Sequence, residues 1–593
     1  MIIRQENTNQ KALMSGNEAI ARGAYEAGVR VATGYPGTPS TEIIESLVEY
    51  DDIYVEWSAN EKVAFEVAYG ASASGGRAIV AMKHVGVNVA ADPLFAASYT
   101  GVRAGFVIVT ADDPEMHSSQ NEQDNRNYAR FAKVPMLEPS DSQEAKDFVR
   151  LAFDMSEEFD TPVFLRTTTR LSHSKSVVNL SQVESHHVPD RLFREPEKYV
   201  LLPRYSRTRH PLVEDRIKRL ADFAETSAIN RVEINERSAG IICSGVCYNY
   251  AKEVFPDYSF LKLGMAYPLP RKKIMDFAET VRKVYVFEEL DPFFEEQIRA
   301  MGIDVTGKEM FSMCGEFSPD IAEKIKGKFD NNVKNGMDSL PGRQPNMCPG
   351  CPYRPVFYTL KKLGLFIAGD IGCYTLGALA PLEAIDSTVC MGASIGYGMG
   401  VDKLLGRHAM GKAVSVIGDA TFLHSGIPGV LNMVYNKSAV TVVILDNRTI
   451  AMTGRQDHPG TGFTIRGDNT HSVDYEALCR SLGVNHVYTI DPFKMAEFET
   501  VVKTEIQRPE PSVIISRGPC VLHRRLQRAD KISFMVKEHM CNGCGECQRL
   551  VCPALEWRRS RAGNTAFINR AMCYGCGVCM QVCKEGAIVE SNE

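Results

Sequence analysis

The sequence lacks the features that would place the chain in a membrane or send it out of the cell. It contains no run of about 18 consecutive apolar residues, so we expect no transmembrane helix. Its first residues, MIIRQENTNQKALMSG, include nothing like the apolar core of a signal peptide. We therefore expect a cytoplasmic protein.

The sequence also lacks an excess of positive charge. Its formal net charge is −6 over 593 residues, which argues against nucleic acid as the main partner. Apolar residues make up 44% of the chain and charged residues 24%, a balance that excludes a largely disordered protein. The length predicts roughly three to five domains.

Cysteine, in contrast, is abundant, with 17 in the chain. In a large chain without an export signal, cysteines indicate metal ligation rather than disulfides. Eight of the 17 lie between Cys541 and Cys583, and one further close pair is formed by Cys348 and Cys351. The C-terminal segment is therefore the first candidate metal site.

Two similar runs make up this segment, CNGCGECQRLVCP at 541–553 and CYGCGVCMQVCK at 573–584. A C-x2-C-x2-C run holds three corners of a 4Fe-4S cluster, and the fourth cysteine of each run ligates the other cluster. The spacing therefore predicts two 4Fe-4S clusters and a protein that carries electrons. The first cluster would use Cys541, Cys544, Cys547 and Cys583, and the second Cys573, Cys576, Cys579 and Cys552.

Both runs depart from the usual pattern. Four residues instead of three precede Cys552, and Lys584 replaces the proline that usually follows the last cysteine. The extra residue widens a loop, and a shifted cluster potential is one expected effect. Zinc on two four-cysteine sites is the alternative, but duplicated three-cysteine runs suit two cubanes better.

Upstream of the tail, apolar runs alternate with helical segments, the pattern of strands and helices around parallel sheets. The predicted strands include 30–33, 78–82, 105–110, 413–419, 440–447 and 511–517. We predict an α/β domain at 1–180, a polar connector at 181–237, a second α/β domain at 238–342, a third at 343–528 and the cysteine-rich domain at 529–593.

Polar residues end two strands of the third series. Gly418 and Asp419 end one predicted strand, and Asn447 ends another 28 residues after Asp419. This pattern resembles the diphosphate-binding motif of thiamine diphosphate enzymes, in which Mg²⁺ takes a carboxylate, an amide oxygen and a backbone carbonyl. The matching positions are Asp419, Asn447 and the carbonyl of Thr449. Alone the pair is weak, because Gly-Asp after a strand is also a common helix N-cap.

Motifs along nearly the whole chain point to one family. They are GYPGTPSTEI (34–43), NEKVAFEVAYGAS (60–72), CPGCPYR (348–354), GDIGCYTLG (369–377), GDATFLHSGI (418–427) and the cysteine-rich tail. In this order they resemble the large, alpha subunits of the indolepyruvate:ferredoxin oxidoreductases, which belong to the thiamine-diphosphate-dependent 2-oxoacid:ferredoxin oxidoreductases. Ala420 departs from the glycine that most thiamine enzymes have at that position.

The resemblance implies an α/β multidomain fold. Two parallel-sheet domains would bind thiamine diphosphate, the one at 1–180 its pyrimidine ring and the one at 343–528 its diphosphate. A transketolase-C-like α/β domain at 238–342 would come between them in the sequence. Residues 529–593 would form a bacterial-type ferredoxin domain with two clusters.

The resemblance also implies catalytic residues. Glu61 matches a glutamate that hydrogen-bonds the aminopyrimidine ring and promotes the imino tautomer that takes the thiazolium proton. Its simpler interpretation is a first-turn glutamate favoured by the helix dipole. Thr38 matches a threonine near the oxoacid, and its simpler interpretation is a turn or N-cap hydroxyl. His424, after Asp419, would either reach the substrate or pack.

A third 4Fe-4S cluster is implied beside the thiamine. Its cysteines would be Cys348, Cys351, Cys373 and Cys520, which have the matching order and similar separations. The alternative is a structural CxxC turn with two buried free cysteines. The other five cysteines have no partners at ligand spacing and are predicted to be core residues. They are Cys243, Cys247, Cys314, Cys390 and Cys479.

The implied reaction is the oxidative decarboxylation of an arylpyruvate such as indolepyruvate, phenylpyruvate or hydroxyphenylpyruvate. Coenzyme A would take the acyl group as an arylacetyl thioester, CO2 would leave, and two electrons would pass through the clusters to a soluble ferredoxin. The resembling enzymes pair this subunit with a smaller beta subunit, which implies an α2β2 assembly. The rival hypotheses are an oxidoreductase for pyruvate or a branched-chain 2-oxoacid, and a non-catalytic electron-transfer subunit.

Overall fold

The computed structural model describes residues 10–186, 188–190, 193–329, 345–523, 525–526, 532–560 and 563–591. The chain divides into two compact units, Met1–Asp338 and Ser339–Glu593. The predicted domain boundaries at 342/343 and 528/529 lie outside the described residues.

The first unit begins with a seven-stranded sheet of the order β12-β6-β7-β5-β4-β2-β3. Six strands run parallel, and β12 pairs antiparallel with β6 at one edge. The strands are β2 (Val31–Gly34), β3 (Tyr54–Trp57), β4 (Ala78–Lys83), β5 (Phe106–Asp112), β6 (Met136–Leu137), β7 (Val163–Thr168) and β12 (Met265–Tyr267). The predicted strands at 30–33, 78–82 and 105–110 correspond to β2, β4 and β5. Continuous apolar runs such as β5 suit a parallel sheet that is covered on both faces.

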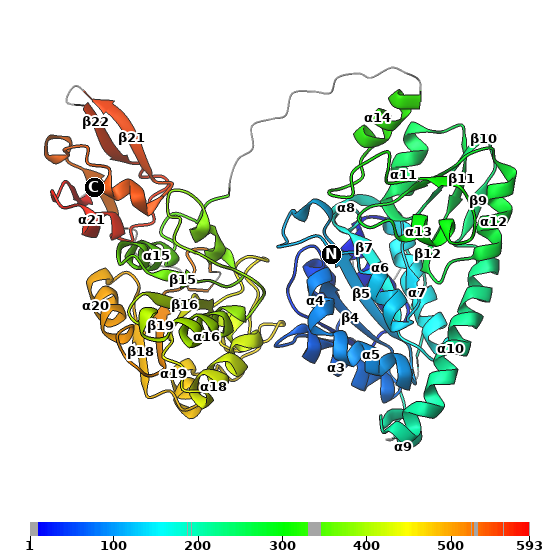
Figure 1. The fold of residues 1–593 in the computed structure, drawn as a ribbon, viewed down its shortest axis with the longest axis horizontal. Coiled ribbons are helices and arrows are strands. Elements are labelled where there is room, and N and C mark those ends of the chain that lie inside the picture. Colours follow the sequence, from blue (N-terminus) through cyan, green and yellow to red (C-terminus); the bar gives the residue numbers. More distant parts are fainter. Residues whose placement is uncertain are drawn as a thin grey trace. The chain divides into compact units, whose positions relative to one another are not determined.

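Helices flank this sheet (Figure 1). They are α1 (Gly16–Glu26), α2 (Thr41–Leu47), α3 (Glu61–Ala73), α4 (His84–Val89), α5 (Ala91–Thr100), η1 (Pro114–Met116), α6 (Arg126–Ala132), α7 (Ser142–Phe159) and α8 (Thr169–His173). α3 packs on β2 and β4, whereas α7 packs on β5 and β7 and against α1. The start of α3 is fixed by Asn60, whose side chain accepts a hydrogen bond from the Val63 amide at 2.9 Å.

The segment predicted as a polar connector contains regular structure. Just before it, β8 (Lys175–Asn179) pairs antiparallel with β1 (Lys11–Ser15). Within it, α9 (Pro196–Tyr199) precedes the 24-residue helix α10 (Pro203–Thr226). α10 packs on α5 and α7 through a narrow buried stripe that includes Val213, Leu220 and Ala224. Because so few of its positions are apolar, the helical period is hard to see in the sequence.

The second part of the first unit holds a five-stranded sheet of the order β14-β13-β10-β11-β9. Its strands are β9 (Arg231–Glu233), β10 (Glu236–Cys243), β11 (Tyr258–Lys262), β13 (Val284–Phe287) and β14 (Val305–Thr306), and β9 alone is antiparallel to its neighbour. The helices are α11 (Gly245–Val254), α12 (Arg271–Thr280), α13 (Phe293–Arg299) and α14 (Pro319–Phe329). Since β12 comes from this part and joins the first sheet, residues 238–338 and the first sheet share one unit.

Buried ion pairs join the two parts of the first unit. Arg126 on α6 pairs with Glu288, which follows β13, at 2.8 Å between Nη1 and Oε2. Its Nη2 also donates to the carbonyl of Glu289 at 2.8 Å. On the first sheet, Arg166 Nε pairs with Asp112 Oδ2 at 2.7 Å. Because breaking a buried pair would leave an uncompensated charge, these contacts fix the carboxyl edge of the first sheet against β13.

The second unit is built on a five-stranded parallel sheet of the order β15-β16-β17-β19-β18. Its strands are β15 (Phe366–Ala368), β16 (Ala413–Gly418), β17 (Thr441–Asp446), β18 (His486–Ile490) and β19 (Ser512–Arg517). The predicted strands at 413–419, 440–447 and 511–517 correspond to β16, β17 and β19. The helices are α15 (Tyr353–Lys362), η2 (Cys373–Ala378), α16 (Ala393–Leu405), η3 (Gly406–His408), α17 (Asp419–Thr421), η4 (Phe422–Gly426), α18 (Ile427–Tyr435), α19 (Tyr475–Ser481) and α20 (Met495–Glu505).

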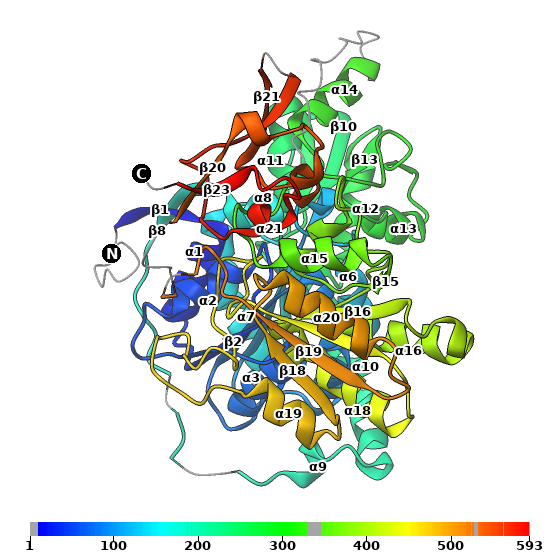
Figure 2. The same ribbon diagram turned by 90° about the vertical axis from the view of Figure 1, so that its left-hand side faces the viewer.

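The cysteine-rich tail contains two short antiparallel strand pairs. β20 (Ser533–Val536) pairs with β23 (Ile588–Ser591), and β21 (Leu555–Ser560) pairs with β22 (Gly563–Ile568). Between them lie η5 (Glu538–Met540), η6 (Glu546–Leu550) and α21 (Val578–Val582). The tail lies over α15, and η6 contacts that helix (Figure 2). A small core that includes Phe534, Leu550 and Ile588 holds the two cysteine runs together.

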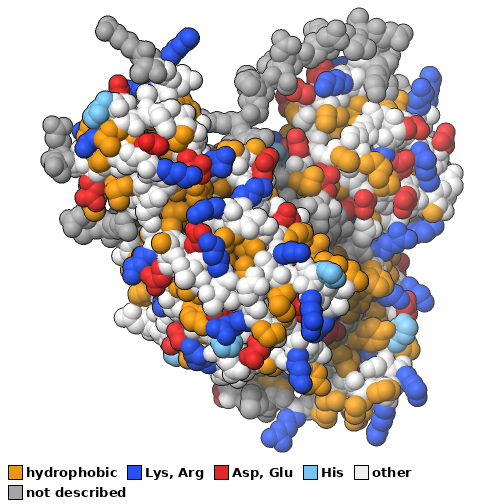
Figure 3. Space-filling view, turned by 60° about the vertical axis from the view of Figure 1, so that its left-hand side comes forward, with side chains coloured by type: hydrophobic (Ala, Val, Ile, Leu, Met, Phe, Trp, Pro, Cys, Tyr) orange, Lys and Arg blue, Asp and Glu red, His pale blue; other side chains and the backbone are white. Residues whose placement is uncertain are grey.

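The surface and the helix lengths agree with the composition. None of the described helices combines the length and the apolarity needed to cross a membrane. Acidic and basic side chains are interspersed over the face drawn in Figure 3.

The prediction that five cysteines are core residues is right for three of them. Cys243, Cys247 and Cys479 are buried, on β10, α11 and α19. Cys314 and Cys390 are exposed, so for them the prediction is wrong. Both lie in bends outside strands and helices, where the chain has no second layer to cover them.

Candidate functional site

Two neighbouring parallel strands of the second unit bring Asp419 and Asn447 together. β16 ends at Gly418, which pairs in register with Leu445 of β17, so both strands end at the same edge of the sheet. Asp419 and Asn447 are the first and second residues beyond that register and are 2% and 3% exposed. The carboxyl edge of an open parallel sheet is where such folds bind ligands.

Hydrogen bonds connect the two halves of this motif. The Arg448 amide donates to Asp419 Oδ2 at 2.9 Å, and the Thr449 amide donates to Asn447 Oδ1 at 3.1 Å. Arg448 has φ +62, a left-handed conformation that turns its amide toward the aspartate. Asp419 and Asn447 therefore come together through the chain that follows β17.

His458 is a residue of this site that the sequence reasoning missed. Its Nε2 lies 3.3 Å from Asp419 Oδ2, and both side chains are about 3% exposed. Its Nδ1 accepts a hydrogen bond from the Gly460 amide at 3.2 Å, so Nε2 is the ring nitrogen that lies near Asp419. The segment QDHPG gives no metal or catalytic spacing that would have singled it out.

The donor set at this edge fits a magnesium diphosphate. Asp419 offers a carboxylate, Asn447 an amide oxygen and Thr449 a backbone carbonyl, and hard divalent cations prefer such oxygen ligands. His458, whose Nε2 lies 3.3 Å from Asp419 Oδ2, adds a further polar side chain to this buried edge. The residues present therefore suit the predicted cofactor.

The four upstream cysteines lie together beside this edge. The pKa of Cys373 is raised to about 11, first by burial and then by the neighbouring thiols of Cys520 and Cys348. The pKa of Cys351 is raised to about 12 by burial, with contributions from Cys348 and Cys520. The Cys520 amide donates to the carbonyl of Asn447 at 3.0 Å. The cysteine group therefore adjoins the candidate magnesium site directly.

The eight tail cysteines line two cavities. A cavity of about 360 Å³ is lined by Cys541, Cys544, Cys547 and Cys583. A second cavity, of about 460 Å³, is lined by Cys552, Cys573, Cys576 and Cys579. Each cavity takes three cysteines from one run and the fourth from the other, the exchange expected of a double-cluster ferredoxin.

The spacing of these thiols bears on the choice between iron clusters and zinc. Four thiolates at about 2.3 Å from a zinc ion place their sulfurs about 3.8 Å apart. Among the residues that the structure describes, no three cysteine sulfurs lie within 4.8 Å of one another.

In the first unit, Glu61 begins α3 just beyond the end of β3 and is 5% exposed. Its side chain lies against Gly86 of α4, where a Cβ would come within 2.9 Å of Glu61 Oε1. Only glycine leaves room for the carboxylate at this point. Glu61 is therefore held at the carboxyl edge of the first sheet, as a catalytic glutamate there would have to be.

Lys83 is a second residue that the sequence reasoning missed. It ends β4, its Nζ donates to the carbonyl of Ser118 at 2.8 Å, and its stem packs on Gly37, where a Cβ would lie 3.2 Å from Lys83 Cγ. Burial lowers the pKa of Lys83 to about 8, although the charges of Asp113 and Glu61 oppose this. Thr38, next to Gly37, is half-buried in the loop after β2. Thr38, Glu61 and Lys83 thus all follow strands that end at one edge.

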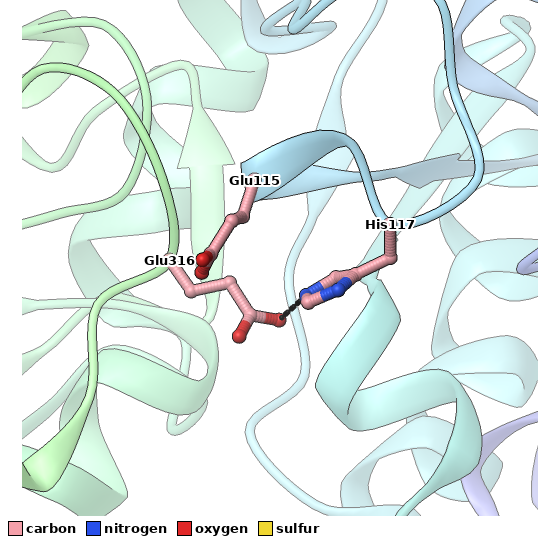
Figure 4. Close-up of side chains that lie close together, drawn as sticks. All are labelled: Glu115, His117 and Glu316. Atoms are coloured by element: carbon pink, nitrogen blue, oxygen red, sulfur yellow. Dashed lines mark ion pairs between the residues drawn. The ribbon is translucent and has the colours of Figure 1, made fainter. Parts of the chain in front are cut away.

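A further cluster follows β5 in the first unit (Figure 4). Glu115, His117 and Glu316 have ligand atoms within 4.8 Å of one another. His117 Nε2 lies 2.9 Å from Glu316 Oε1, and Arg170 Nη2 lies 2.6 Å from Glu316 Oε2. Because the guanidinium already neutralises Glu316, and Glu115 and His117 are exposed, we interpret the cluster as an ion-pair network rather than a metal site.

His424 lies in the π-helical turn η4, directly after α17. It is 4% exposed, and its Nδ1 shares a hydrogen bond with Ser425 Oγ at 2.5 Å. Single π-turns often mark functional sites. The ring is therefore packed within the turn that starts from Asp419, and a contact with substrate stays a prediction.

Two family models match the chain where these sites lie. Residues 22–237 match the thiamine-diphosphate-binding model of pyruvate flavodoxin/ferredoxin oxidoreductase, a range that includes Thr38, Glu61 and Lys83. Residues 370–516 match the C-terminal TPP-binding domain of thiamine pyrophosphate enzymes, a range that includes Asp419 and Asn447. Both parallel-sheet domains are therefore of thiamine-diphosphate-binding type.

Curated relatives match the chain over nearly its whole length. The indolepyruvate oxidoreductase subunit IorA of Archaeoglobus fulgidus is 41% identical over 92% of this chain and 93% of its own. The IorA subunit of Methanothermobacter thermautotrophicus is 40% identical over 98% and 97%, and that of Pyrococcus horikoshii is 38% identical over 100% and 99%. The chain therefore belongs to the alpha-subunit (IorA) family of the thiamine-diphosphate-dependent indolepyruvate:ferredoxin oxidoreductases.

Proposed function

We propose that the chain catalyses the oxidative decarboxylation of arylpyruvates with coenzyme A. An arylpyruvate, CoA and two oxidised ferredoxins give arylacetyl-CoA, CO2, a proton and two reduced ferredoxins. The observation that carries the proposal is the contact between Cys520 and Asn447, at 3.0 Å from amide to carbonyl. It puts a cysteine group for electron uptake next to the residues of a thiamine diphosphate motif.

Each thiamine-binding domain would supply residues for a different part of the cofactor. Asp419, Asn447 and the carbonyl of Thr449 would bind Mg²⁺, with Gly418 giving the backbone close access to the diphosphate. Glu61 would hydrogen-bond the aminopyrimidine ring, and Thr38 would lie near the oxoacid. Thiamine diphosphate, when bound, supplies the carbanion chemistry that releases CO2, while the protein orients it and excludes water.

Electrons would leave through three 4Fe-4S clusters. Cys348, Cys351, Cys373 and Cys520 would hold the first of them, beside the cofactor. Cys351 lines the same cavity as the tail set of Cys552, Cys573, Cys576 and Cys579, so this set would receive the electrons next. The set with Cys544, whose side chain is exposed, would deliver them to ferredoxin.

The partners follow from the same proposal. The relatives are named as subunits, and we expect this chain to act with a smaller beta subunit in an α2β2 assembly. Soluble ferredoxin would be the electron acceptor and coenzyme A the acyl acceptor. Neither nucleic acid nor a membrane is part of the proposed reaction.

The substrate class is tested by kinetics of the purified complex with indolepyruvate, phenylpyruvate and pyruvate. Burial of an aromatic side chain in a pocket contributes about 1.5–3 kcal/mol. We therefore expect kcat/KM for the arylpyruvates to exceed that for pyruvate about 10- to 150-fold. Faster turnover of pyruvate would remove the aryl assignment, and a complex that binds no thiamine diphosphate would favour a non-catalytic electron carrier.

Within this proposal, Lys83 would bind the carboxylate of the 2-oxoacid. It is a half-buried cation at the edge where Thr38 and Glu61 lie, and its Nζ uses one hydrogen for Ser118 and has two more to donate. A hydrogen bond to a charged group contributes about 1.5–3 kcal/mol. We expect Lys83→Met to raise KM for the oxoacid about 10- to 150-fold, with thiamine diphosphate affinity within twofold of the wild type.

The pH dependence separates this role from a structural one. The pKa of Lys83, lowered to about 8 by burial against the charges of Asp113 and Glu61, means that the free enzyme loses the cation above pH 8. We expect kcat/KM to fall above that pH in the wild type and to stay level in Lys83→Arg. His84, whose pKa is lowered to about 4, is neutral throughout this range.

Lys62→Met, on the exposed side of α3, is the control. An unchanged KM in Lys83→Met would contradict the assignment.

A further inference from the structure

One buried arginine connects the upstream cysteines to the tail. Arg354 lies on α15, three residues after Cys351, and is 3% exposed. A guanidinium has five N–H donors, and all five of these meet an acceptor. Nε donates to the carbonyl of Cys348 at 3.0 Å. Nη1 donates to the carbonyls of Leu550 and Val551, just before Cys552. Nη2 donates to Asn346 and Met347, just before Cys348. The acceptors are the carbonyls of Met347, Cys348, Leu550 and Val551 and the amide oxygen of Asn346.

The acceptor at Val551 lies in the first cysteine run, in the stretch that is one residue longer than usual. The usual run has three residues before its last cysteine, and here there are four. Val551, immediately before Cys552, has φ +56, a left-handed conformation that β-branched residues rarely adopt. In this conformation its carbonyl accepts from Arg354 and also from Asn346 Nδ2 at 3.4 Å. Val551 thus completes the acceptor set of the arginine.

The two cysteine sets also contact each other at a second place, which does not involve Arg354. Gly350, between Cys348 and Cys351, has φ +73, and a Cβ there would lie 2.5 Å from the Cβ of Tyr574. Tyr574 follows Cys573, a member of the second tail set. Cys351 and Arg354 both line the cavity of that set. The upstream pair and the second tail set are therefore packed face to face, with Arg354 at their junction.

The side chains around the Arg354 guanidinium include cysteines of both sets. Burial lowers the pKa of its guanidinium, and the groups that oppose this are Cys552, Cys351, Cys348 and Cys576. Two of these cysteines, Cys348 and Cys351, belong to the upstream set, and the other two belong to the second tail set.

We propose that Arg354 is a positioning residue that fixes the upstream cysteine set against the second tail set, and that the longer spacing before Cys552 serves this contact. The inference rests on the proposed clusters. Each electron lost by the cluster on the upstream set would be gained by the cluster on the set that includes Cys552, and no bond would form or break. Arg354 sets the separation over which that electron passes.

The test compares Arg354→Met, which removes the charge and the donors, with Arg354→Lys, which keeps the charge without the planar fork. At equal iron content, we expect both to slow reduction of the tail clusters by the oxoacid about 10- to 100-fold, the range for lost outer-shell contacts. We also expect a weaker magnetic interaction between the reduced clusters in electron paramagnetic resonance. KM for the oxoacid should not change. Arg480→Met, on the exposed side of α19, is the control.

Deletion of Val551 gives an independent variant, because it restores the usual spacing and leaves Arg354 in place. We expect the same slow reduction and weak interaction as in Arg354→Met. Should Arg354→Met lose iron, Arg354→Lys and the deletion decide the question. Wild-type rates and spectra in these variants would overturn the inference. A wild-type chain with only about eight irons would instead contradict the upstream cluster, so the two proposals fail separately.

Discussion

Replacing Glu61 by glutamine is expected to lower kcat about 10²- to 10⁴-fold, the range for a lost general acid–base group. Glutamine keeps the size of the side chain but neither accepts nor releases a proton at the pyrimidine ring. Glu61 is packed on Gly86, where a Cβ would lie 2.8 Å from its Cγ, so the position of the side chain is fixed on that side. The measurement is ferredoxin or dye reduction by indolepyruvate under saturating thiamine diphosphate.

The control for Glu61→Gln is Glu66→Gln, on the same helix. Glu66 is exposed and pairs with Lys62 on the surface of α3, so its loss should change kcat less than twofold. Thiamine diphosphate affinity should stay within a few-fold of the wild type in both variants, because the diphosphate residues are untouched. Turnover of Glu61→Gln within threefold of the wild type would rule out the assigned role and favour a helix-dipole glutamate.

The sequence predicted the parts of the fold that follow from apolar runs and from residues at strand ends. β4, β5, β16, β17 and β19 are six or seven residues long, and each contains a short apolar run that is followed by polar residues. Since parallel strands end at one edge, Asp419 and Asn447 could be paired before the structure was known. α10 could not, because its buried stripe is too narrow to give a visible period.

Some residues of the candidate sites could likewise be predicted from the sequence, and others could not. Cysteine spacing carries the chemistry of the tail, so the grouping of the eight thiols into two cavities could be foreseen. Lys83 and His458 are single residues whose importance comes from what the fold places beside them. Arg354 is the last residue of the CPGCPYR motif, but its acceptors at Leu550 and Val551 lie nearly 200 residues away in the sequence. No local pattern predicts a contact of that separation.

Replacing one cysteine is expected to change the number of clusters that the chain binds. Cys520→Ala should lower the iron content of the anaerobically purified chain from about twelve to about eight atoms, because a cubane short of one thiolate is lost while the two tail clusters keep all their ligands. The substitution leaves the Cys520 amide in place, and with it the 3.0 Å hydrogen bond to the Asn447 carbonyl. Thiamine diphosphate should therefore still bind, whereas oxoacid-dependent reduction of the tail clusters should be lost.

Cys479→Ala is the matched control, since Cys479 is buried in α19 of the same unit and lies outside every proposed cluster. Its iron content should remain at about twelve, with the wild-type electron paramagnetic resonance spectrum. Iron and sulfide analysis separates the possibilities directly. About eight irons in both the wild type and Cys520→Ala would show that the tail alone binds clusters, and the CxxC pair at Cys348 and Cys351 would then be a structural turn. A fall confined to Cys520→Ala would place the first electron acceptor beside Asn447, where the cofactor motif ends.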